Sequence, residues 1–300
     1  MHRKFLFLVN PISGTRSKQS LPELIAAAAK RHAARFEIFH TVASGDYGFI
    51  KEKIQEHGFT DVIMCGGDGT VNTVVQQLVD TDVNFGIVPL GSGNGLALSA
   101  RIPKNTPRAL EIAFTGKASP VDAFTINGAF ACMLCGLGFD AQVAHDFARQ
   151  KKRGLLTYTQ QSLKQFFKAS PYSFEIALEN TRFSTEAWFI SIANSNQFGN
   201  QVTIAPKASL SDGLLDIVIV RKMSKAQLPI SLLLQIAGNN RLSQPGALKK
   251  SGIIYLQAEA LKIKNTDAAP LHIDGEPKST AKEFDIKVIP ACFKLIQPVV

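Results

Sequence analysis

The sequence lacks a hydrophobic run long enough to cross a membrane. A spanning helix needs about 20 apolar residues, and the longest candidate, Leu228 to Ala237, reaches roughly half of that length. Cysteine is scarce too, with four in the chain. Cys132 and Cys135 form a Cys-x-x-Cys pair with no second pair and no nearby histidine, which excludes a structural zinc site. We interpret both as small residues of a buried strand.

Signals for export and for nucleic-acid binding are missing as well. The N-terminus has no secretory signal, so we expect a cytoplasmic protein. The formal net charge of +9 comes without an RNA-binding or zinc-finger signature, so we expect no nucleic-acid partner but peripheral contact with an anionic membrane surface. The basic run at 149–153, followed by Phe166 and Phe167, either lies on such a surface or forms a solvated helix end.

Short apolar runs alternate with longer helical patterns in the first 120 residues. The pattern predicts strands at 5–9, 36–40, 61–65 and 85–88, and helices at 21–34, 47–57, 71–79 and 96–100. This alternation is typical of a parallel sheet covered by helices on both faces. Such sheets bind ligands at the carboxyl ends of their strands.

Segments of period two dominate after about Val121. They occur at 173–178, 187–193, 215–220, 253–257, 261–264 and 284–289, and they indicate an antiparallel sandwich or barrel. Helical patterns at 155–168 and 224–239 interrupt them, the latter with Ser224 as a candidate N-cap. The sequence therefore predicts an α/β domain at 1–121 and a β-rich domain at 122–290.

The loop Gly66-Gly67-Asp68-Gly69-Thr70 joins a predicted strand directly to a predicted helix. Its glycines free backbone N–H groups for an anion, and the positive end of the helix dipole adds to this preference. A carboxylate beside a polyphosphate needs a divalent cation between the two, so Asp68 argues for Mg²⁺. The alternative is a tight turn in which Asp68 or Thr70 only caps the helix.

Two further loops follow neighbouring predicted strands, and neither is a Walker A sequence or a G-x-G-x-x-G fingerprint. One is Gly91-Ser92-Gly93-Asn94, and the other is Asn10-Pro11-Ile12-Ser13-Gly14. Each offers amides to the same crevice at the carboxyl end of the sheet. Three such loops together favour nucleotide binding.

Five motifs in one order resemble the diacylglycerol kinase catalytic domain, which bacterial lipid kinases share with sphingosine and ceramide kinases. They are Asn10-Pro11-x-Ser13-Gly14, the Gly66 to Thr70 loop with Asn72, Ser92-Gly93-Asn94, Ser211-Asp212-Gly213-Leu214-Leu215-Asp216, and Ile273-Asp274-Gly275-Glu276-Pro277. The resemblance covers essentially the whole chain. It implies a Rossmann-like α/β domain of the NAD kinase and diacylglycerol kinase type, a C-terminal antiparallel β-sandwich, and residues 291–300 returning to the first domain.

The resemblance also implies the roles of individual residues. Asp68 would organise Mg²⁺, supported by Asp122, and Asp274 or Glu276 would accept the proton of the lipid hydroxyl. Asp212 would bind a structural Mg²⁺ with backbone oxygens near Ser209 and Leu214. The residues that would contact ATP are Asn10, Pro11, Ser13, Gly14, Thr41, Gly66, Gly67, Asp68, Gly69, Thr70, Asn72, Gly91, Ser92, Gly93 and Asn94.

The chain departs from the family at Gly95, where many diacylglycerol kinases have Asp. The expected activity is transfer of the γ-phosphate of ATP to the hydroxyl of a lipid, with diacylglycerol as first acceptor. A sphingoid-base or ceramide kinase, an NAD kinase and a non-catalytic lipid or nucleotide sensor are the alternatives. Two copies of the chain could pair through exposed strand edges.

Overall fold

The computed structural model describes residues 3–14, 19–148, 169–196, 205–224, 227 and 252–299. The chain forms two compact units. Unit 1 holds Met1–Asp122 and Pro290–Val300, and unit 2 holds Ala123–Phe198 and Val202–Ile289, so the division falls inside two long strands, β5 (Lys117–Ile126) and β15 (Glu283–Gln297). The helical pattern at 155–168, most of that at 224–239 and the basic run at 149–153 lie outside the described residues.

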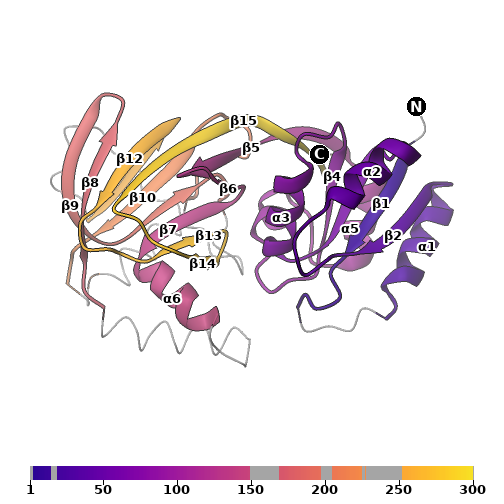
Figure 1. Cartoon of the computed structure of the whole chain (residues 1–300), viewed down its shortest axis with the longest axis horizontal. Helices are drawn as coiled ribbons and strands as arrows, with labels where there is room; N and C mark the ends of the chain where they lie inside the picture. Colours follow the sequence, from indigo (N-terminus) through magenta and orange to yellow (C-terminus); the bar gives the residue numbers. More distant parts are fainter. Residues whose placement is uncertain are drawn as a thin grey trace. The chain divides into compact units, whose positions relative to one another are not determined.

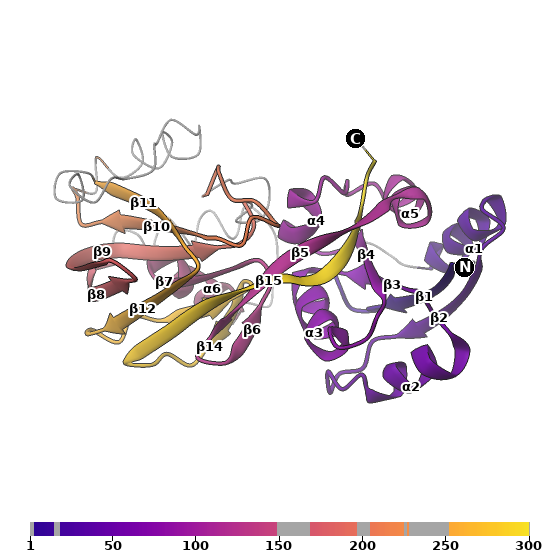
Figure 2. The same cartoon turned by 90° about the horizontal axis from the view of Figure 1, so that it is seen from above.

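Unit 1 is a parallel sheet between helices, as the sequence predicts. Its strands are β1 (Lys4–Val9), β2 (Arg35–His40), β3 (Asp61–Gly66) and β4 (Asn84–Pro89), in the order β4-β3-β1-β2, and the end of β15 pairs in parallel with β4. The helices α1 (Leu21–Arg31) and α5 (Thr106–Thr115) lie on one face, and α2 (Gly48–His57) and α3 (Asp68–Leu78) lie on the other (Figure 2).

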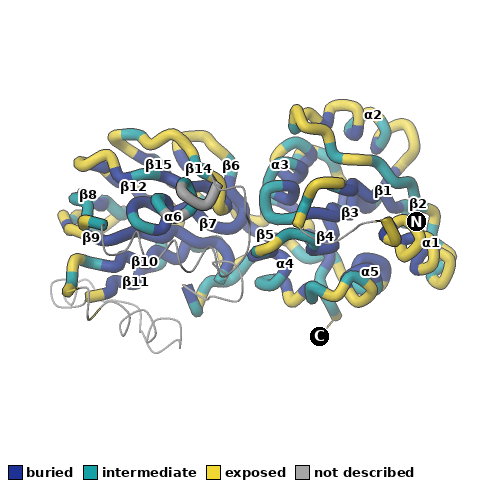
Figure 3. Tube along the Cα trace, turned by 90° about the horizontal axis from the view of Figure 1, so that it is seen from below, coloured by how far each residue is buried: buried dark blue, intermediate teal, exposed yellow. Residues whose placement is uncertain are grey.

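Burial explains why the strands of unit 1 read as continuous apolar runs. All residues of β3, and all but the first of β1 and β4, are buried, as expected for strands covered on both faces. The helices bury one stripe each and expose the opposite side, which Figure 3 shows as alternating colours along α1 and α2. Helix α4 (Gly95–Ser99) is short and follows β4.

Helix α5 is absent from the sequence-based assignment, although its start has a recognisable signal. The Asn105 side chain accepts a hydrogen bond from the Arg108 amide at 3.0 Å, and Pro107 lies in the first turn. An Asn N-cap followed by proline is a standard helix start. An amphipathic pattern of ten residues follows this start.

Unit 2 is an antiparallel β-rich unit (Figure 1). Its sheet runs in the order β14-β13-β7-β9-β8-β12-β15, with β10 paired to β9 and to β11. The bounds of its elements are β6 (Ala129–Ala131), β7 (Leu134–Gly138), α6 (Phe139–Ala148), β8 (Tyr172–Leu178), β9 (Thr181–Ala193), β10 (Leu215–Arg221), β11 (Ile253–Ala258), β12 (Ala260–Asn265), β13 (Leu271–Ile273) and β14 (Glu276–Lys278). The predicted fold class, a parallel α/β part followed by an antiparallel β part, is confirmed.

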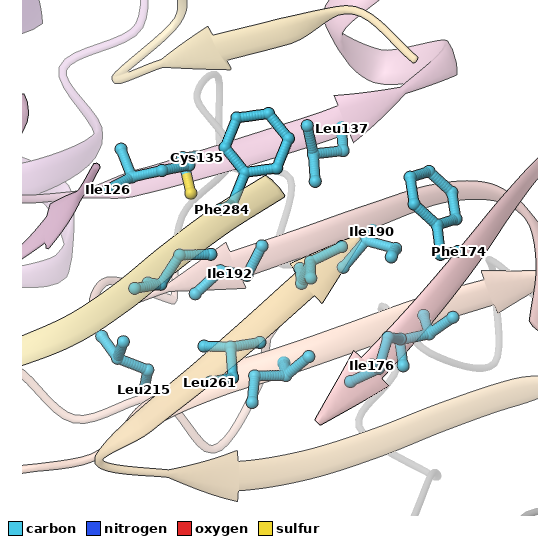
Figure 4. Close-up of a cluster of buried hydrophobic side chains, with 14 of the residues drawn as sticks. Ile126, Cys135, Leu137, Phe174, Ile176, Ile190, Ile192, Leu215, Leu261 and Phe284 are labelled. Carbon is cyan, nitrogen blue, oxygen red and sulfur yellow. The ribbon is translucent and has the colours of Figure 1, made fainter. Parts of the chain in front are cut away.

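Two apolar clusters flank the strands of unit 2. Ile217 and Ile219 of β10 join the larger cluster, whereas Val218 and Val220 join the smaller one, so β10 is buried on both faces. In Figure 4 side chains of the larger cluster, from strands far apart in the sequence, point toward a shared interior. The Cys135 thiol lies in this cluster and Cys132 is also buried, consistent with their interpretation as small buried residues.

A buried ion pair ties unit 1 together at the amino ends of its strands. Asp61 opens β3 and is fully buried. Arg3 donates to both of its carboxylate oxygens, at 3.0 and 2.8 Å, and the Thr60 hydroxyl and the Asn84 amide add bonds of 2.6 and 3.1 Å. Arg3 also donates to two carbonyl oxygens in the last turn of α5. The pair thereby joins the sheet to a helix.

Replacing Asp61 by alanine leaves the Arg3 guanidinium without its carboxylate partner. We expect the variant to lose about 2 kcal/mol of unfolding free energy in urea denaturation, because charged hydrogen bonds to a buried carboxylate are lost while Arg3, 32% exposed, keeps its two carbonyl acceptors. Asp82→Ala is the control, because its carboxylate is 93% exposed and bonds Lys294 at the surface. That change should cost less than about 0.5 kcal/mol. Equal urea midpoints for the two variants would contradict the structural role given to Asp61.

Candidate active site

Three loops continue from the carboxyl ends of adjacent strands β1, β3 and β4. The backbone hydrogen bonds of the sheet extend into them: the Asn10 amide donates to the Cys65 carbonyl at 2.9 Å, and the Leu90 amide donates to the Gly66 carbonyl at 2.8 Å. The loops predicted to bind a nucleotide, at 10–14, 66–70 and 91–94, are therefore brought together at one end of the sheet of unit 1.

The three loops touch through their backbones, and only glycine permits this approach. A Cβ atom at Gly14 would lie 2.0 Å from the Leu90 carbonyl oxygen, and one at Gly91 would lie 2.5 Å from the Gly67 Cα atom. Both distances are far below contact. Gly14 also has a φ of +61°, which glycine adopts without strain. Glycine at these positions thus lets the loops form one continuous backbone surface.

Side chains lock the loops in place. The Asp68 carboxylate accepts the Asn94 amide at 2.7 Å, which joins the second loop to the third. Asn94, with a φ of +60°, bonds both the amide and the carbonyl of Gly91 through its side chain. The Asn10 side chain donates to the Thr70 hydroxyl at 2.8 Å, which joins the first loop to the second. The first and second loops are therefore each bonded to a neighbour by a side chain of their own, whereas the third loop contributes its Asn94 amide.

Helix α3 begins at Asp68, immediately after this junction. The residue at its N-cap position is Gly67, which has no side chain, so neither Asp68 nor Thr70 occupies the position that the capping alternative assigned to them. The first amides of a helix have no intrahelical acceptor. The positive end of the α3 dipole therefore lies among the loop amides, an arrangement that attracts anions.

Other predicted residues of unit 1 occupy separate positions. The Thr41 amide donates to the Val9 carbonyl at 3.0 Å, and the Thr41 side chain bonds the buried Tyr47 hydroxyl, whose pKa is raised by burial. Asn72 is half-buried in α3. Asp122 is buried in β5, where one oxygen accepts the Ala291 amide at 2.7 Å.

The motif at 273–277 forms a two-residue β-hairpin in unit 2. Ile273 pairs with Glu276, and the residues between them, Asp274 and Gly275, have φ angles of +49° and +82°. Asp-Gly with two positive φ angles is the preferred composition of a type I′ turn. Asp274 is therefore the first residue of the turn, and Glu276 is the first residue of the strand that follows it.

The two carboxylates of this hairpin differ in environment. Asp274 is buried, and its oxygens accept the amides of Cys132, Met133 and Leu134 at 2.9 to 3.0 Å. The Glu276 side chain is 59% exposed and approaches Lys278 at 3.5 Å. Asp274 therefore holds the turn against the start of β7, whereas Glu276 is accessible to a reactant.

Comparison with known proteins identifies the family. The model of the diacylglycerol kinase catalytic domain matches residues 4–126, and that of the YegS C-terminal NAD kinase beta sandwich-like domain matches residues 134–297, more than half of the chain. The chain belongs to the diacylglycerol kinase family. A relative named "Probable lipid kinase YegS-like" from Enterobacter sp. (strain 638) is 31% identical, over 83% of this chain and 82% of the relative.

Two further proteins match at lower sequence identity. The diacylglycerol kinase of Bacillus subtilis (strain 168) is 26% identical over 79% of this chain and 77% of its own length. The crystal structure of a diacylglycerol kinase from Bacillus anthracis str. Sterne has a TM-score of 0.74 with 21% identity, covering 98% of this chain and 97% of that chain. At this identity the structural likeness supports the fold.

The remaining family motif, at 211–216, begins as a turn at 211–214 and continues into the first residues of β10. One Asp212 oxygen accepts the Leu214 amide at 3.1 Å, Gly213 has a φ of +72°, and the Ser209 hydroxyl accepts the Ser211 amide at 3.4 Å. No group of three or more His, Cys, Asp or Glu side chains that could hold a metal occurs in the described part of the chain. Any cation here would need backbone oxygens in addition to Asp212.

Several polar residues were given no role from sequence. Asp216 ends the last motif, is fully buried and accepts the Tyr255 hydroxyl at 2.5 Å. Asp140 and His272 form a buried pair next to the 273–277 hairpin. The partners of Asp216 and His272 are distant in the sequence, and therefore no local spacing indicates them.

Burial, reinforced by the nearby charge of Asp212, raises the pKa of Asp216 to about 6. The folded protein then holds a proton that the unfolded chain has lost, so the stability of the wild-type protein should fall as pH rises from about 4 to about 6. The Asp216→Asn variant should lack this component of the fall. The measurement is urea denaturation at several pH values with a chelator present. Parallel pH profiles for the two proteins would contradict the raised pKa.

A methyl group at Gly91 should force the glycine loops apart. We expect Gly91→Ala to lose about 2 kcal/mol of unfolding free energy, a typical cost of overpacking, in urea denaturation. Ser92→Ala in the same loop is the matched control, and because Ser92 is exposed it should change stability by less than about 0.5 kcal/mol. A Gly91→Ala protein as stable as this control would show that the backbone contact tolerates a side chain.

Proposed function

We propose that this protein is a lipid kinase that transfers the γ-phosphate of ATP to a lipid hydroxyl, with diacylglycerol as the first acceptor. The observation that carries the proposal is the backbone contact of the Gly14, Gly67 and Gly91 loops. Without Cβ atoms at these glycines the three loops pack together beside the start of α3, where the helix dipole and the N-terminal helix amides favour a phosphate. Family membership supports the same reaction class, and the Bacillus subtilis relative is named a diacylglycerol kinase.

In this proposal the triphosphate of ATP lies on the amides of the three loops and at the start of α3. Thr41 and Asn72 complete the nucleotide contacts. Asp68 supplies a hard carboxylate oxygen for Mg²⁺, which neutralises phosphate charge when bound. Asp122 supports this group from β5. Asp212, with backbone oxygens near Ser209 and Leu214, holds a structural Mg²⁺ in unit 2.

Glu276, rather than Asp274, is the proposed proton acceptor. A base must come within hydrogen-bond reach of the hydroxyl that it deprotonates. The Asp274 oxygens already accept three backbone amides in a buried position, whereas Glu276 is exposed and approaches Lys278 at 3.5 Å. Asp274 then positions the turn, and Glu276 orients the lipid hydroxyl and removes its proton as the phosphoryl group is transferred.

Gly95 bears on the identity of the lipid acceptor. This glycine opens α4 where many diacylglycerol kinases have Asp, and the loop before it is similar to the Ser-Gly-Asn form of sphingosine and ceramide kinases. A sphingoid base or ceramide is therefore the second candidate acceptor, ahead of NAD. The net charge of +9 would draw the enzyme to anionic headgroups on the cytoplasmic membrane surface. None of the described helices has the length and apolar content of a bilayer-spanning segment.

The reaction is tested by incubating the purified protein with Mg²⁺ and γ-labelled ATP and, separately, diacylglycerol, a sphingoid base, ceramide and NAD. We expect label in a lipid, with diacylglycerol the best acceptor. Label in NADP alone would replace the proposal with an NAD kinase. No label in any acceptor would favour a non-catalytic sensor of lipid or nucleotide.

Glu276→Gln should lower kcat by about 10² to 10⁴, the usual contribution of a general base, with little change in KM for ATP. Lys278→Ala, on the same strand, is the control and should stay near the wild-type rate. Asp274→Asn should instead lower the unfolding midpoint, because the side-chain NH₂ group would face backbone N–H donors. A fast Glu276→Gln enzyme would remove Glu276 from the mechanism.

A further inference from the structure

A buried histidine, His272, and a buried aspartate, Asp140, lie next to the 273–277 hairpin. The His272 Nε2 atom is 3.4 Å from the Asp140 carboxylate, and both side chains are at most 5% exposed. His272 belongs to β13 and Asp140 to the first turn of α6, so the pair links a helix to the hairpin. Burying polar side chains costs free energy of desolvation unless each of them makes hydrogen bonds in the folded protein.

The other nitrogen of His272 faces the turn. Its Nδ1 atom accepts the Gly275 amide at 3.3 Å. An imidazole nitrogen that accepts a bond carries no proton, so the ring proton lies on Nε2, where it is donated to Asp140. The chain of contacts therefore runs from the Asp140 carboxylate through the His272 ring to the residue immediately before Glu276.

Two further contacts hold the Asp140–His272 pair in place. A Cβ atom at Gly136 would lie 2.0 Å from the Asp140 carboxylate and 2.5 Å from the His272 ring, so the pair packs directly on the β7 backbone. The His145 ring, also in α6, bonds the Leu271 carbonyl at 2.8 Å. Helix α6 thus holds two successive residues of β13.

We infer that Asp140 and His272 are positioning residues that fix the direction in which the hairpin presents Glu276. The inference rests on the proposed function. Asp274 anchors one end of the turn to the amides at 132–134, and His272 anchors the other through Gly275. Neither buried side chain is exposed to a reactant, so the pair acts through the turn. A displacement of a reacting group by about 1 Å can cost roughly 10²-fold in rate, which makes such support consequential.

The test compares His272→Leu with His272→Asn, two variants of similar size. The Asn side chain places an oxygen near the position of Nδ1 and keeps the acceptor for the Gly275 amide, whereas Leu removes it. We expect His272→Leu to lower kcat for lipid phosphorylation by about 10- to 100-fold with KM for ATP unchanged, and His272→Asn to recover most of the rate. His57→Leu, which replaces an exposed histidine in α2, is the control and should keep the wild-type kcat.

A double-variant cycle separates positioning from a general loss of structure. If His272 acts through Glu276, then His272→Leu should reduce the residual rate of the Glu276→Gln enzyme by less than about threefold. Hydrogen exchange at the Gly275 amide should be faster in His272→Leu than in His272→Asn.

The outcomes are distinct. A wild-type rate in His272→Leu, equal slowing in both variants, or the same fold-loss in the Glu276→Gln background would overturn the inference while leaving the kinase assignment intact. A wild-type protein that transfers no phosphate to any lipid would overturn the proposed function, and the positioning role with it.

Discussion

The proposed nucleotide site depends on the close backbone approach of three glycine loops at the end of the parallel sheet. Gly14 packs against the Leu90 carbonyl and Gly91 packs against Gly67, at distances that leave no room for a side chain at Gly14 or Gly91, and these contacts join three separate strand ends into one backbone surface. Asn10 and Asp68 then bond across the junctions, so the surface is held before any ligand arrives. Preorganised donors stabilise an anion without a cost of rearrangement at the moment of binding, and phosphoryl transfer depends heavily on such positioning.

The carboxylates of this chain divide according to what occupies their oxygens. Asp61, Asp122 and Asp274 are buried and accept hydrogen bonds from amides, an amide side chain or a guanidinium, so each fixes geometry. Glu276 is exposed beside a lysine. Asp68 lies between these classes, since it bonds the Asn94 amide at the junction where the proposed triphosphate lies. Three of these five carboxylates fix the structure, and the other two, Asp68 and Glu276, have roles in the proposed reaction.

The sequence predicts the outline of the fold well because the outline depends on local periodicity. The runs of β1, β3 and β4 and the alternation of β12 are visible in the residues themselves. Helices α5 and α6 were missed, although α2, which has the same length as α5, was found. The glycine loops were found because glycine spacing after a strand is a local signal.

The supporting residues of the candidate site could not be found in that way. Asp140 and His272 are separated by most of unit 2, and their contact exists only because β7 and β13 pair. The difference between Asp274 and Glu276 likewise depends on where the amides at 132–134 lie, which no spacing within the motif indicates. Sequence therefore proposes which residues carry chemistry, and tertiary structure distinguishes the environments in which they lie.

The most direct test of the central claim is calorimetric titration of the protein with ATP, ADP and adenosine, each with and without Mg²⁺. If the loop amides bind the phosphates, ATP with Mg²⁺ should bind at least about tenfold more tightly than adenosine, a difference of about 1.4 kcal/mol, with ADP between them. Adenosine binding as tightly as ATP, or no heat of binding with Mg²⁺ present, would contradict the account.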